Sequence, residues 1–240
     1  MSINKILEKI LDLLYPGRCP VCDRILAYRE TLVCPDCIGK LVYIKEPKCM
    51  KCGKQMMDNE AEYCGGCRDK RQYFRKGFSV FLYNDAMRKS IYRFKYANRR
   101  EYSRFYAEAV CRHLGKEIRE FCADAIIPVP LHPKRFRKRG YNQAGLIAGE
   151  IGRRMGIPVR EEILIRERNT KALKLMTLTE RENNLKKAFK MVKNDVKLNT
   201  VIIVDDILTT GSTINEISRV LRENDIKNVY FVALASGADV

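Results

Sequence analysis

The sequence lacks long apolar runs, and no stretch approaches the roughly 18 consecutive apolar residues that a membrane-spanning helix requires. Residues 1–16, MSINKILEKILDLLYP, lack a small-residue cleavage site and carry charges throughout, so we expect no secretory signal and no transmembrane segment. Hydrophobic residues are not scarce: they make up 46% of the 240 positions, which excludes a disordered protein. We therefore expect a globular protein of the cytoplasm.

The apolar residues of the N-terminal segment recur at helical spacing, at positions 3, 6, 7, 10, 11 and 14. This pattern predicts a helix with one apolar face. Such a face can pack against the protein's own domain, or it can bind a partner protein or the inner face of the cell membrane. The sequence leaves both alternatives open.

Eight of the ten cysteines fall in four CxxC pairs whose starts are spaced every 15 residues. Each pair turns two thiolates toward one ion, and two pairs complete a four-cysteine zinc site. The pairs are Cys19 and Cys22, Cys34 and Cys37, Cys49 and Cys52, and Cys64 and Cys67. Sequential pairing predicts two structural zinc ions, one held within residues 19–37 and one within residues 49–67. The alternatives are interleaved pairing, iron–sulfur ligation and four disulfides.

The metal-binding segment differs in charge from the rest of the chain. We expect an N-terminal helix with a double zinc ribbon over residues 1–72 and an α/β domain over residues 73–240. The formal net charge is +17, of which +14 lies after residue 72. This excess favours a polyanionic partner or phosphorylated ligands, and it places a nucleic-acid surface mainly in the second domain. Cys111 and Cys122, outside the pairs, are expected to be buried.

Strand and helix patterns alternate from residue 77 onward. Short aliphatic or aromatic runs predict strands, and helical spacing of apolar residues predicts the helices between them. The predicted strands are 78–83, 125–130, 163–165, 201–204 and 229–235, and the predicted helices are 85–96, 103–118, 141–156, 180–188 and 212–222. Strands that are aliphatic throughout and alternate with helices are typical of a mostly parallel sheet flanked by helices.

The stretch VIIVDDILTTGST, residues 201–213, combines features of a sugar-phosphate site. In parallel sheets ligands bind at the carboxyl ends of strands, where we expect Asp205 and Asp206 to lie. TTGST then opens a helix whose free N–H groups form a phosphate cradle. A ribose 5-phosphate fits, with its hydroxyls on the carboxylates and its phosphate on the amides. The lysine of a Walker A loop is absent, which argues against an ordinary ATPase site.

VIIVDDILTTGST resembles the signature by which type I phosphoribosyltransferases bind phosphoribosyl pyrophosphate (PRPP). Together with the four CxxC pairs, IIPVPLHPKRFRKRGYNQA (126–144) and the ER…NN…AF run (180–189), it resembles the ComF/GntX family, which has members needed for DNA uptake in naturally competent bacteria. The resemblance implies a type I phosphoribosyltransferase-like sheet flanked by helices. It implies that Asp205 and Asp206 bind the ribose hydroxyls as catalytic residues. It also implies that the 5-phosphate is bound by Thr209, Thr210, Gly211, Ser212 and Thr213.

By the same resemblance, the segment after IIPVP is the pyrophosphate-binding loop. A leaving diphosphate must be screened, normally by Mg²⁺ and fixed cations. KRFRKRG supplies these cations without an acidic residue among them, and we expect Arg139 and Gly140 at the start of a helix. The residues singled out for the diphosphate are Lys134, Arg135, Arg139 and Gly140. A solvated basic loop is the alternative.

Three departures from related sequences limit the expected chemistry. Leu173 stands where the family often has a glutamine after Thr170, and Thr209 stands where purine-salvage enzymes carry an aspartate. The chain also has no glutaminase domain. These differences disfavour hypoxanthine-type salvage and exclude a complete glutamine-dependent amidotransferase, and the acceptor base or amine is not specified by the sequence.

Residues 88–104 are rich in cations interleaved with aromatic residues. Cations that follow phosphates, beside aromatic faces that stack on bases, are typical of single-stranded nucleic-acid binding. The candidates are Arg88, Lys89, Arg93, Lys95, Arg99 and Arg100. The alternative is an amphipathic helix with Ile91, Phe94 and Tyr102 turned inward.

Three functions remain open at this point. The first is a PRPP- and Mg²⁺-binding phosphoribosyltransferase-family protein that handles single-stranded DNA in competence, with competence-machinery proteins as partners. The second is an active phosphoribosyltransferase of nucleotide metabolism. The third is a non-enzymatic zinc-bearing nucleic-acid-binding protein.

Overall fold

A computed structural model describes residues 16–26, 32–167, 188–192 and 196–239. The expected N-terminal helix, nearly all of the expected helix 180–188, and Thr170 and Leu173 lie outside these ranges. Within them, no helix combines the length and the apolar character needed to cross a membrane.

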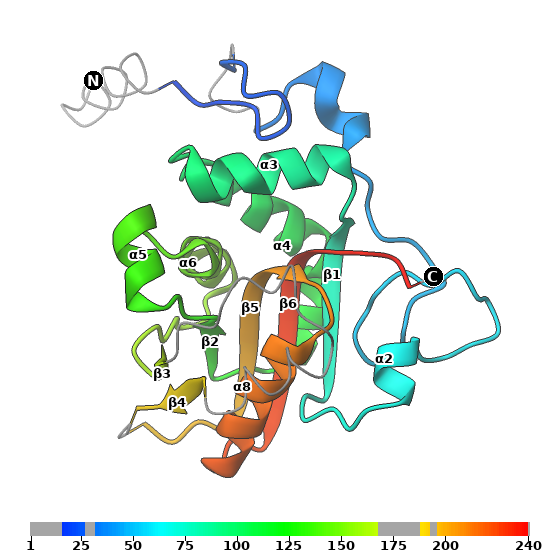
Figure 1. The fold of residues 1–240 in the computed structure, drawn as a ribbon, viewed down its shortest axis with the longest axis vertical. Helices are drawn as coiled ribbons and strands as arrows, with labels where there is room; N and C mark the ends of the chain where they lie inside the picture. The colour runs from blue at the N-terminus through cyan, green and yellow to red at the C-terminus, as the bar shows by residue number, and fades with distance from the viewer. Residues whose placement is uncertain (1–15, 27–31, 168–187, 193–195, 240) are drawn as a thin grey trace.

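Four parallel strands form the central sheet in the order β1-β6-β5-β2 (Figure 1). Their bounds are β1 Lys76–Leu82, β2 Ala125–Pro128, β5 Thr200–Leu208 and β6 Asn228–Ser236. Val201 to Val204 are each at most 1% exposed, which explains why the run is aliphatic on both faces. The parallel sheet predicted from the sequence is confirmed.

Helices cover both faces of this sheet (Figure 1). One face packs on α3 (Asp85–Tyr96), α4 (Tyr102–Glu120) and α6 (Gln143–Met155), and the other on α8 (Ser212–Glu223). A small antiparallel pair, β3 (Leu164–Arg166) and β4 (Phe189–Met191), stands beside the second face. Ile202 and Val204 of β5 join the first core, and Val201 and Ile203 join the second, as strand alternation requires.

Helix ends follow local chemistry. The side chain of Asn84 accepts a hydrogen bond from the Met87 N–H at 2.9 Å and caps α3, which begins and ends where the sequence predicts. Gly156, at φ 71°, stops α6 in the left-handed conformation that glycine adopts without strain. The predicted end of the helix 141–156 at this glycine is therefore confirmed.

Two local expectations are wrong. Strand β5 continues to Leu208 because its ladder with β6 pairs Asp205 with Ala233 and Leu208 with Ser236, so both acids lie within the strand. Residues Pro133–Arg139 form a short helix, α5, whose C-cap is Gly140 at φ 80°. Arg139 and Gly140 therefore end a helix instead of beginning one, since a proline at the first turn and the His132 cap start α5 earlier in the chain.

The cysteine-rich segment lies along the β1 edge of the sheet. Ile44 N–H donates to Val80 O at 3.0 Å and Leu82 N–H donates to Val42 O at 2.8 Å, which adds residues 42–44 to that edge. Farther along, Gly77 N–H donates to Lys51 O at 2.9 Å. The segment contains two short helices, η1 (Pro35–Lys40) and α2 (Gly65–Arg68), and it covers backbone groups that an open edge would expose.

Candidate functional site

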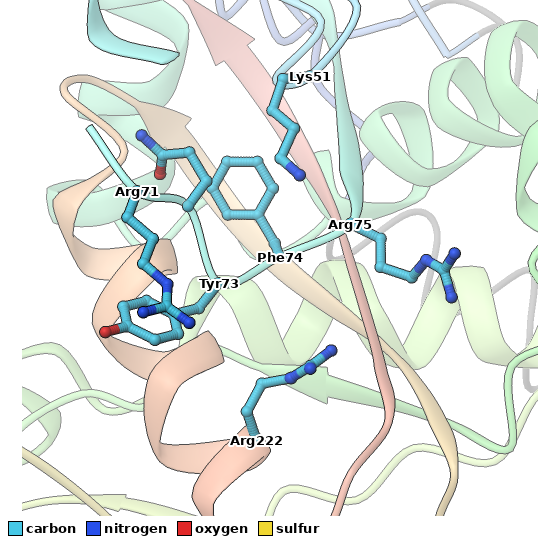
Figure 2. Close-up of a pocket in the computed structure, with 7 residues that line it drawn as sticks. Lys51, Arg71, Tyr73, Phe74, Arg75 and Arg222 are labelled. Carbon is cyan, nitrogen blue, oxygen red and sulfur yellow. The ribbon is translucent and has the colours of Figure 1, made fainter. Parts of the chain in front are cut away.

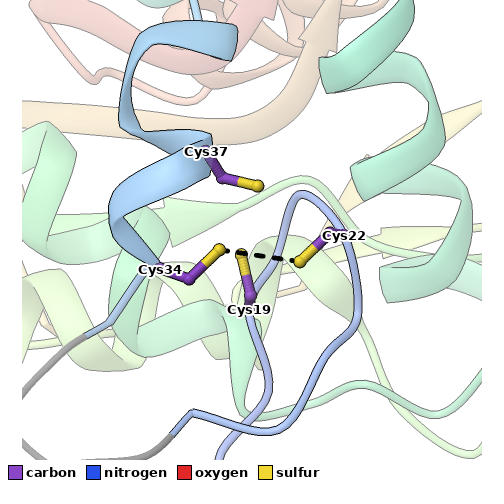
Figure 3. A group of neighbouring side chains, drawn as sticks. All are labelled: Cys19, Cys22, Cys34 and Cys37. Carbon is purple, nitrogen blue, oxygen red and sulfur yellow. Dashed lines mark hydrogen bonds between the residues drawn. The ribbon is translucent and has the colours of Figure 1, made fainter.

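The eight paired cysteines gather into two clusters, each made from two successive CxxC pairs (Figure 3 shows the first). All four sulfur atoms of a cluster lie within 4.8 Å of one another. Cys22 Sγ lies 3.6 Å from Cys34 Sγ, and Cys52 Sγ lies 3.5 Å from Cys64 Sγ. A tetrahedral Zn²⁺ with Zn–S near 2.3 Å needs sulfur atoms about 3.8 Å apart, whereas a disulfide needs about 2.05 Å. The sequential pairing is confirmed, and both four-cysteine sites fit zinc.

The two cysteines outside the CxxC pairs were both expected to be buried, and one of them is not. Cys111 on α4 is half-buried, and Cys122 is exposed at φ 48° in the turn after that helix. The prediction that Cys122 is buried is wrong, because α4 ends at Glu120 and the turn lies on the surface.

The two acids of β5 face opposite sides of the sheet, because successive side chains of a strand alternate. Asp206 points to the face covered by α3, where Lys95 Nζ lies 2.7 Å from its Oδ1. Asp205 points to the face of β3, where it interacts electrostatically with Arg166. The two carboxylates therefore lie on opposite faces of the sheet near the end of β5, and not side by side on one face.

Asp205 is half-buried, and its Oδ1 accepts the Asp206 N–H at 2.8 Å. Burial, together with the adjacent Asp206 carboxylate, raises the pKa of Asp205 to about 7. A carboxyl group with a pKa in this range can hold or release a proton near neutral pH, which is typical of functional sites and also of strained buried acids.

Arg166 is a site residue that the sequence reasoning missed. It is 9% exposed, lies over the Phe189 ring at 5.2 Å, and its pKa is lowered to about 10 by burial and by the nearby Arg135 guanidinium. Arg166 therefore lies near both Asp205 on the acid strand, which attracts it, and Arg135 on helix α5, which repels it. The only sequence signal was a lone arginine ending a short aliphatic strand.

The loop after β5 has the form expected of a phosphate cradle. Thr209 and Thr210 are exposed, and Gly211 at φ 77° is the N-cap of α8. Thr210 Oγ1 and Ser212 Oγ lie 2.9 Å apart, which closes the turn. The first N–H groups of α8, from Ser212 and Thr213 onward, have no intrahelical acceptor and lie at the positive end of the helix dipole.

Helix α5 presents cations next to this strand end. Arg139 donates a short hydrogen bond to Gln143 and lies over the Tyr96 ring at 5.1 Å. Lys134 belongs to the first turn of α5, and its N–H is capped by His132 Nδ1 at 3.2 Å. Arg135 lies close enough to Arg166 to lower the pKa of that guanidinium. Gly140 packs near the Arg100 guanidinium.

Three of the six nucleic-acid candidates on α3 and its C-terminal turn bind part-buried partners far away in the sequence. Lys95 binds Asp206, Arg93 Nη1 donates to Val21 O at 2.9 Å, and Arg99 donates to both oxygens of Asp23 at 2.7 and 2.9 Å. Arg88 pairs with Asp85 and Arg100 donates to Asn98, both at the surface, and Lys89 is exposed. Ile91, Phe94 and Tyr102 are buried, as the amphipathic alternative predicted. The internal partners identify α3 as a connector between the first zinc knuckle and the acid strand.

Comparisons with known proteins agree with this arrangement. The double zinc ribbon domain family matches residues 10–68, and the phosphoribosyl transferase domain family matches residues 142–239. Among solved structures, a hypoxanthine phosphoribosyltransferase from Staphylococcus aureus aligns at 15% identity and a TM-score of 0.34, over 55% of this chain and 64% of that one.

Curated relatives align over nearly the full chain. DNA utilization protein YhgH of Escherichia coli K12 is 29% identical over 87% of this chain and 92% of its own length. Competence protein ComFC of Streptococcus pneumoniae is 26% identical over 85% of this chain and 88% of its own. Competence protein F of Haemophilus influenzae is 32% identical over 91% of this chain and 96% of its own. With both family domains matched and this relative aligned end to end, the chain belongs to the ComF/GntX family of double zinc ribbon proteins with a phosphoribosyltransferase domain.

Proposed function

We propose that this protein binds PRPP with Mg²⁺ at the carboxyl end of β5. The observation that carries the proposal is the Thr209–Thr213 loop at the N-terminus of α8, which is exposed at Thr209 and Thr210 and begins four residues after the half-buried Asp205. The loop N–H groups bind the 5-phosphate, and the carboxylate of Asp205 accepts the ribose hydroxyls. Because the two acids face opposite sides of the strand, Asp205 is the one that reaches the ribose, and Asp206 shares its charge with Lys95.

The cations near Asp205 suit the diphosphate of the ligand. Arg135 and Arg139 lie on α5, and Arg166 is buried between α5 and the acid strand. Fixed cations in a partly dry site stabilise the charge that develops on a departing diphosphate, and Mg²⁺ held by the ligand adds to that stabilisation. This supports a second candidate, a working phosphoribosyltransferase. Pyrophosphate release on mixing PRPP with single bases or amines tests it, and absence of release with every acceptor tried contradicts it.

The biological role we propose is the handling of single-stranded DNA during uptake. Relatives bearing the names competence protein F, ComFC and DNA utilization protein align over most of the chain. We place the protein in the cytoplasm, with competence-machinery proteins as partners, and divide it into a zinc module of residues 1–72 and a phosphoribosyltransferase-like domain of residues 73–240. A third candidate is a zinc-bearing nucleic-acid binder whose sugar-phosphate site is not used.

A thermal-shift titration tests the PRPP site. PRPP raises the melting temperature when Mg²⁺ is present, and ribose 5-phosphate, which lacks the diphosphate, gives a smaller shift. Asp205→Asn reduces the PRPP shift, whereas Asp85→Asn, at an exposed aspartate on α3, leaves it unchanged. If PRPP at millimolar concentration gives no shift in the wild-type protein, the PRPP-binding functions are both excluded.

A further inference from the structure

A cationic cavity of about 360 Å³ lies beside the start of β1, at the end of the sheet where the parallel strands begin. Figure 2 shows the side chains around it. Four of them are cations, namely Lys51, Arg71, Arg75 and Arg222, and two are aromatic, Tyr73 and Phe74. Nothing in the family domains or in the curated relatives' names assigns a role to this cavity.

Three parts of the chain meet there because of the parallel topology. The linker residues 71–75 lead into β1 at Lys76, and Arg222 lies in the last turn of α8, which leads into β6 at Asn228. Lys51 lies between Cys49 and Cys52, the third CxxC pair and part of the second zinc cluster, and its carbonyl accepts the Gly77 N–H. The cavity therefore lies where the strands begin, whereas Asp205 and the Thr209–Thr213 loop lie where β5 ends.

Neutral groups hold these cations in place. Arg75 Nη1 donates to Asn228 Oδ1 at 2.6 Å, and Arg222 Nη1 donates to Lys227 O at 2.7 Å. Arg71 lies over the Tyr73 ring at 5.3 Å, and Lys51 lies over the Phe74 ring at 5.7 Å. Such contacts fix positive groups without neutralising them.

Nearby acidic residues pair elsewhere. Asp69 pairs with Arg68 at 3.3 Å and Glu223 pairs with Arg219 at 2.5 Å. Across the described part of the chain, none of the four cavity cations forms an ion pair with a carboxylate. Four cations around one hollow repel each other, and a bound polyanion relieves that repulsion.

We propose that this cavity binds backbone phosphates of single-stranded nucleic acid. Arginine guanidinium groups suit phosphate oxygens, and the half-buried Tyr73 beside Arg71 offers an aromatic face for a neighbouring base. The α3 surface suits this less well, since Arg93, Lys95 and Arg99 bind internal partners. The proposal rests on the DNA-handling role proposed above and gives that role a site distinct from the PRPP loop.

The test is fluorescence anisotropy with a labelled single-stranded oligothymidylate over a series of salt concentrations. The cavity variant Arg71→Gln/Arg222→Gln is compared with two others that remove the same charge. Arg112→Gln/Lys116→Gln changes exposed cations on α4, and Arg88→Gln/Lys89→Gln changes the exposed cations of α3. Zinc content and melting temperature verify that each variant folds.

The cavity variant is expected to bind more weakly. The negative slope of log K against log salt should become less steep by about 1.4, or about 0.7 for each lost phosphate contact on a single strand. The α4 variant keeps the wild-type slope. Equal weakening by all three variants, loss in the α3 variant alone, or no binding by the wild type overturns the proposal. Competition by thymidine 5′-monophosphate as strong as that of the strand at equal phosphate concentration also overturns it, because the cavity then takes a nucleotide and not a strand.

The PRPP-dependent shift in melting temperature is measured on the cavity variant as well. The shift is expected to persist, because the variant removes two guanidinium groups at the cavity, whereas Arg71 meets the first turn of α8 through its backbone carbonyl, which accepts from Asn215 Nδ2 at 3.0 Å. A protein that binds the strand through the cavity but gives no PRPP shift contradicts the PRPP site alone. One that gives the shift but binds no strand contradicts the cavity and the DNA-handling role, and leaves the PRPP site in place.

Discussion

Lys95 Nζ lies 2.7 Å from Asp206 Oδ1, which joins the last turn of α3 to the acid strand β5. Both side chains are largely buried, at 19% and 13% exposure. The same helix region holds the first zinc knuckle through Arg93 and Arg99, which bind Val21 O and Asp23. Helix α3 and its C-terminal turn therefore position Asp206, which is adjacent to the proposed ribose ligand Asp205, and a loop of the first metal site.

Removing one partner of this pair is expected to destabilise the fold. Lys95→Met leaves the Asp206 carboxylate buried without its cation, which costs about 3 kcal/mol at the lower end of the range for buried pairs. Adding Asp206→Asn removes the stranded charge, so the double variant recovers part of that loss. Urea denaturation of the two single variants and the double variant measures the coupling, with Lys116→Met at an exposed site as control. Strictly additive losses would mean that the two side chains do not interact.

The raised pKa of Asp205 predicts a dependence of stability on pH. The pKa is about 7 in the folded protein, where burial and Asp206 disfavour the charged form, and about 4 in the unfolded chain. Between these values the folded state binds a proton that the unfolded state has released, so this carboxyl group's contribution to stability falls as pH rises from about 4 to about 7.

The comparison of wild type with Asp205→Asn isolates this contribution. Their difference in free energy of unfolding is expected to change between pH 4 and pH 7 and to level off above pH 7. Denaturant titrations at several pH values measure it, and Asp85→Asn provides an exposed aspartate as control. A constant difference across the whole window contradicts the raised pKa.

Each four-cysteine cluster is expected to hold its own zinc ion. Cys34→Ser removes a ligand of the first site, so the purified protein should lose one of its two equivalents of zinc and part of its stability, because metal binding supplies folding energy to such modules. Cys122→Ser, at an exposed cysteine outside the clusters, should keep both equivalents. Metal analysis together with melting curves checks this. Loss of both equivalents in Cys34→Ser would contradict independent sites.

Features set by neighbouring residues could be read from the sequence. The CxxC spacing predicted which four cysteines share a site, and the apolar spacing of residues 85–96 predicted α3 at its observed bounds. The aliphatic run Val201–Val204 predicted the central strand. Each of these signals depends on geometry that repeats within a few residues, which is why they held.

Features that depend on residues far apart in the sequence could not be predicted from the sequence. The extension of β5 through Asp205 and Asp206 depends on pairing with β6, although the apolar Ile207 and Leu208 after the acids were a usable signal. The Lys95–Asp206 pair spans 111 residues, so no local pattern could predict that Lys95, a candidate for nucleic-acid binding, pairs with an acid of β5. Arg166 reaches the site through a small sheet whose second strand lies far along the chain.

Gly211 offers a test of the phosphate loop that does not change charge. Its φ of 77° is strained for any residue with a Cβ, so Gly211→Ala should cost about 1 to 2 kcal/mol or shift the turn before α8. A shifted turn misaligns the N–H groups of Ser212 and Thr213, so PRPP affinity should fall by more than stability alone explains.

Gly149→Ala is the matched control. It lies within α6, where an added Cβ contacts nothing within 4 Å, so the change should stabilise the protein by about 0.5 to 1 kcal/mol and leave PRPP binding unchanged. Calorimetric titration with PRPP and Mg²⁺, performed where both variants are fully folded, separates the two effects. If Gly211→Ala binds PRPP as tightly as Gly149→Ala, the loop N–H groups do not hold the 5-phosphate, and the ligand must be sought at the cations of α5 and Arg166 instead.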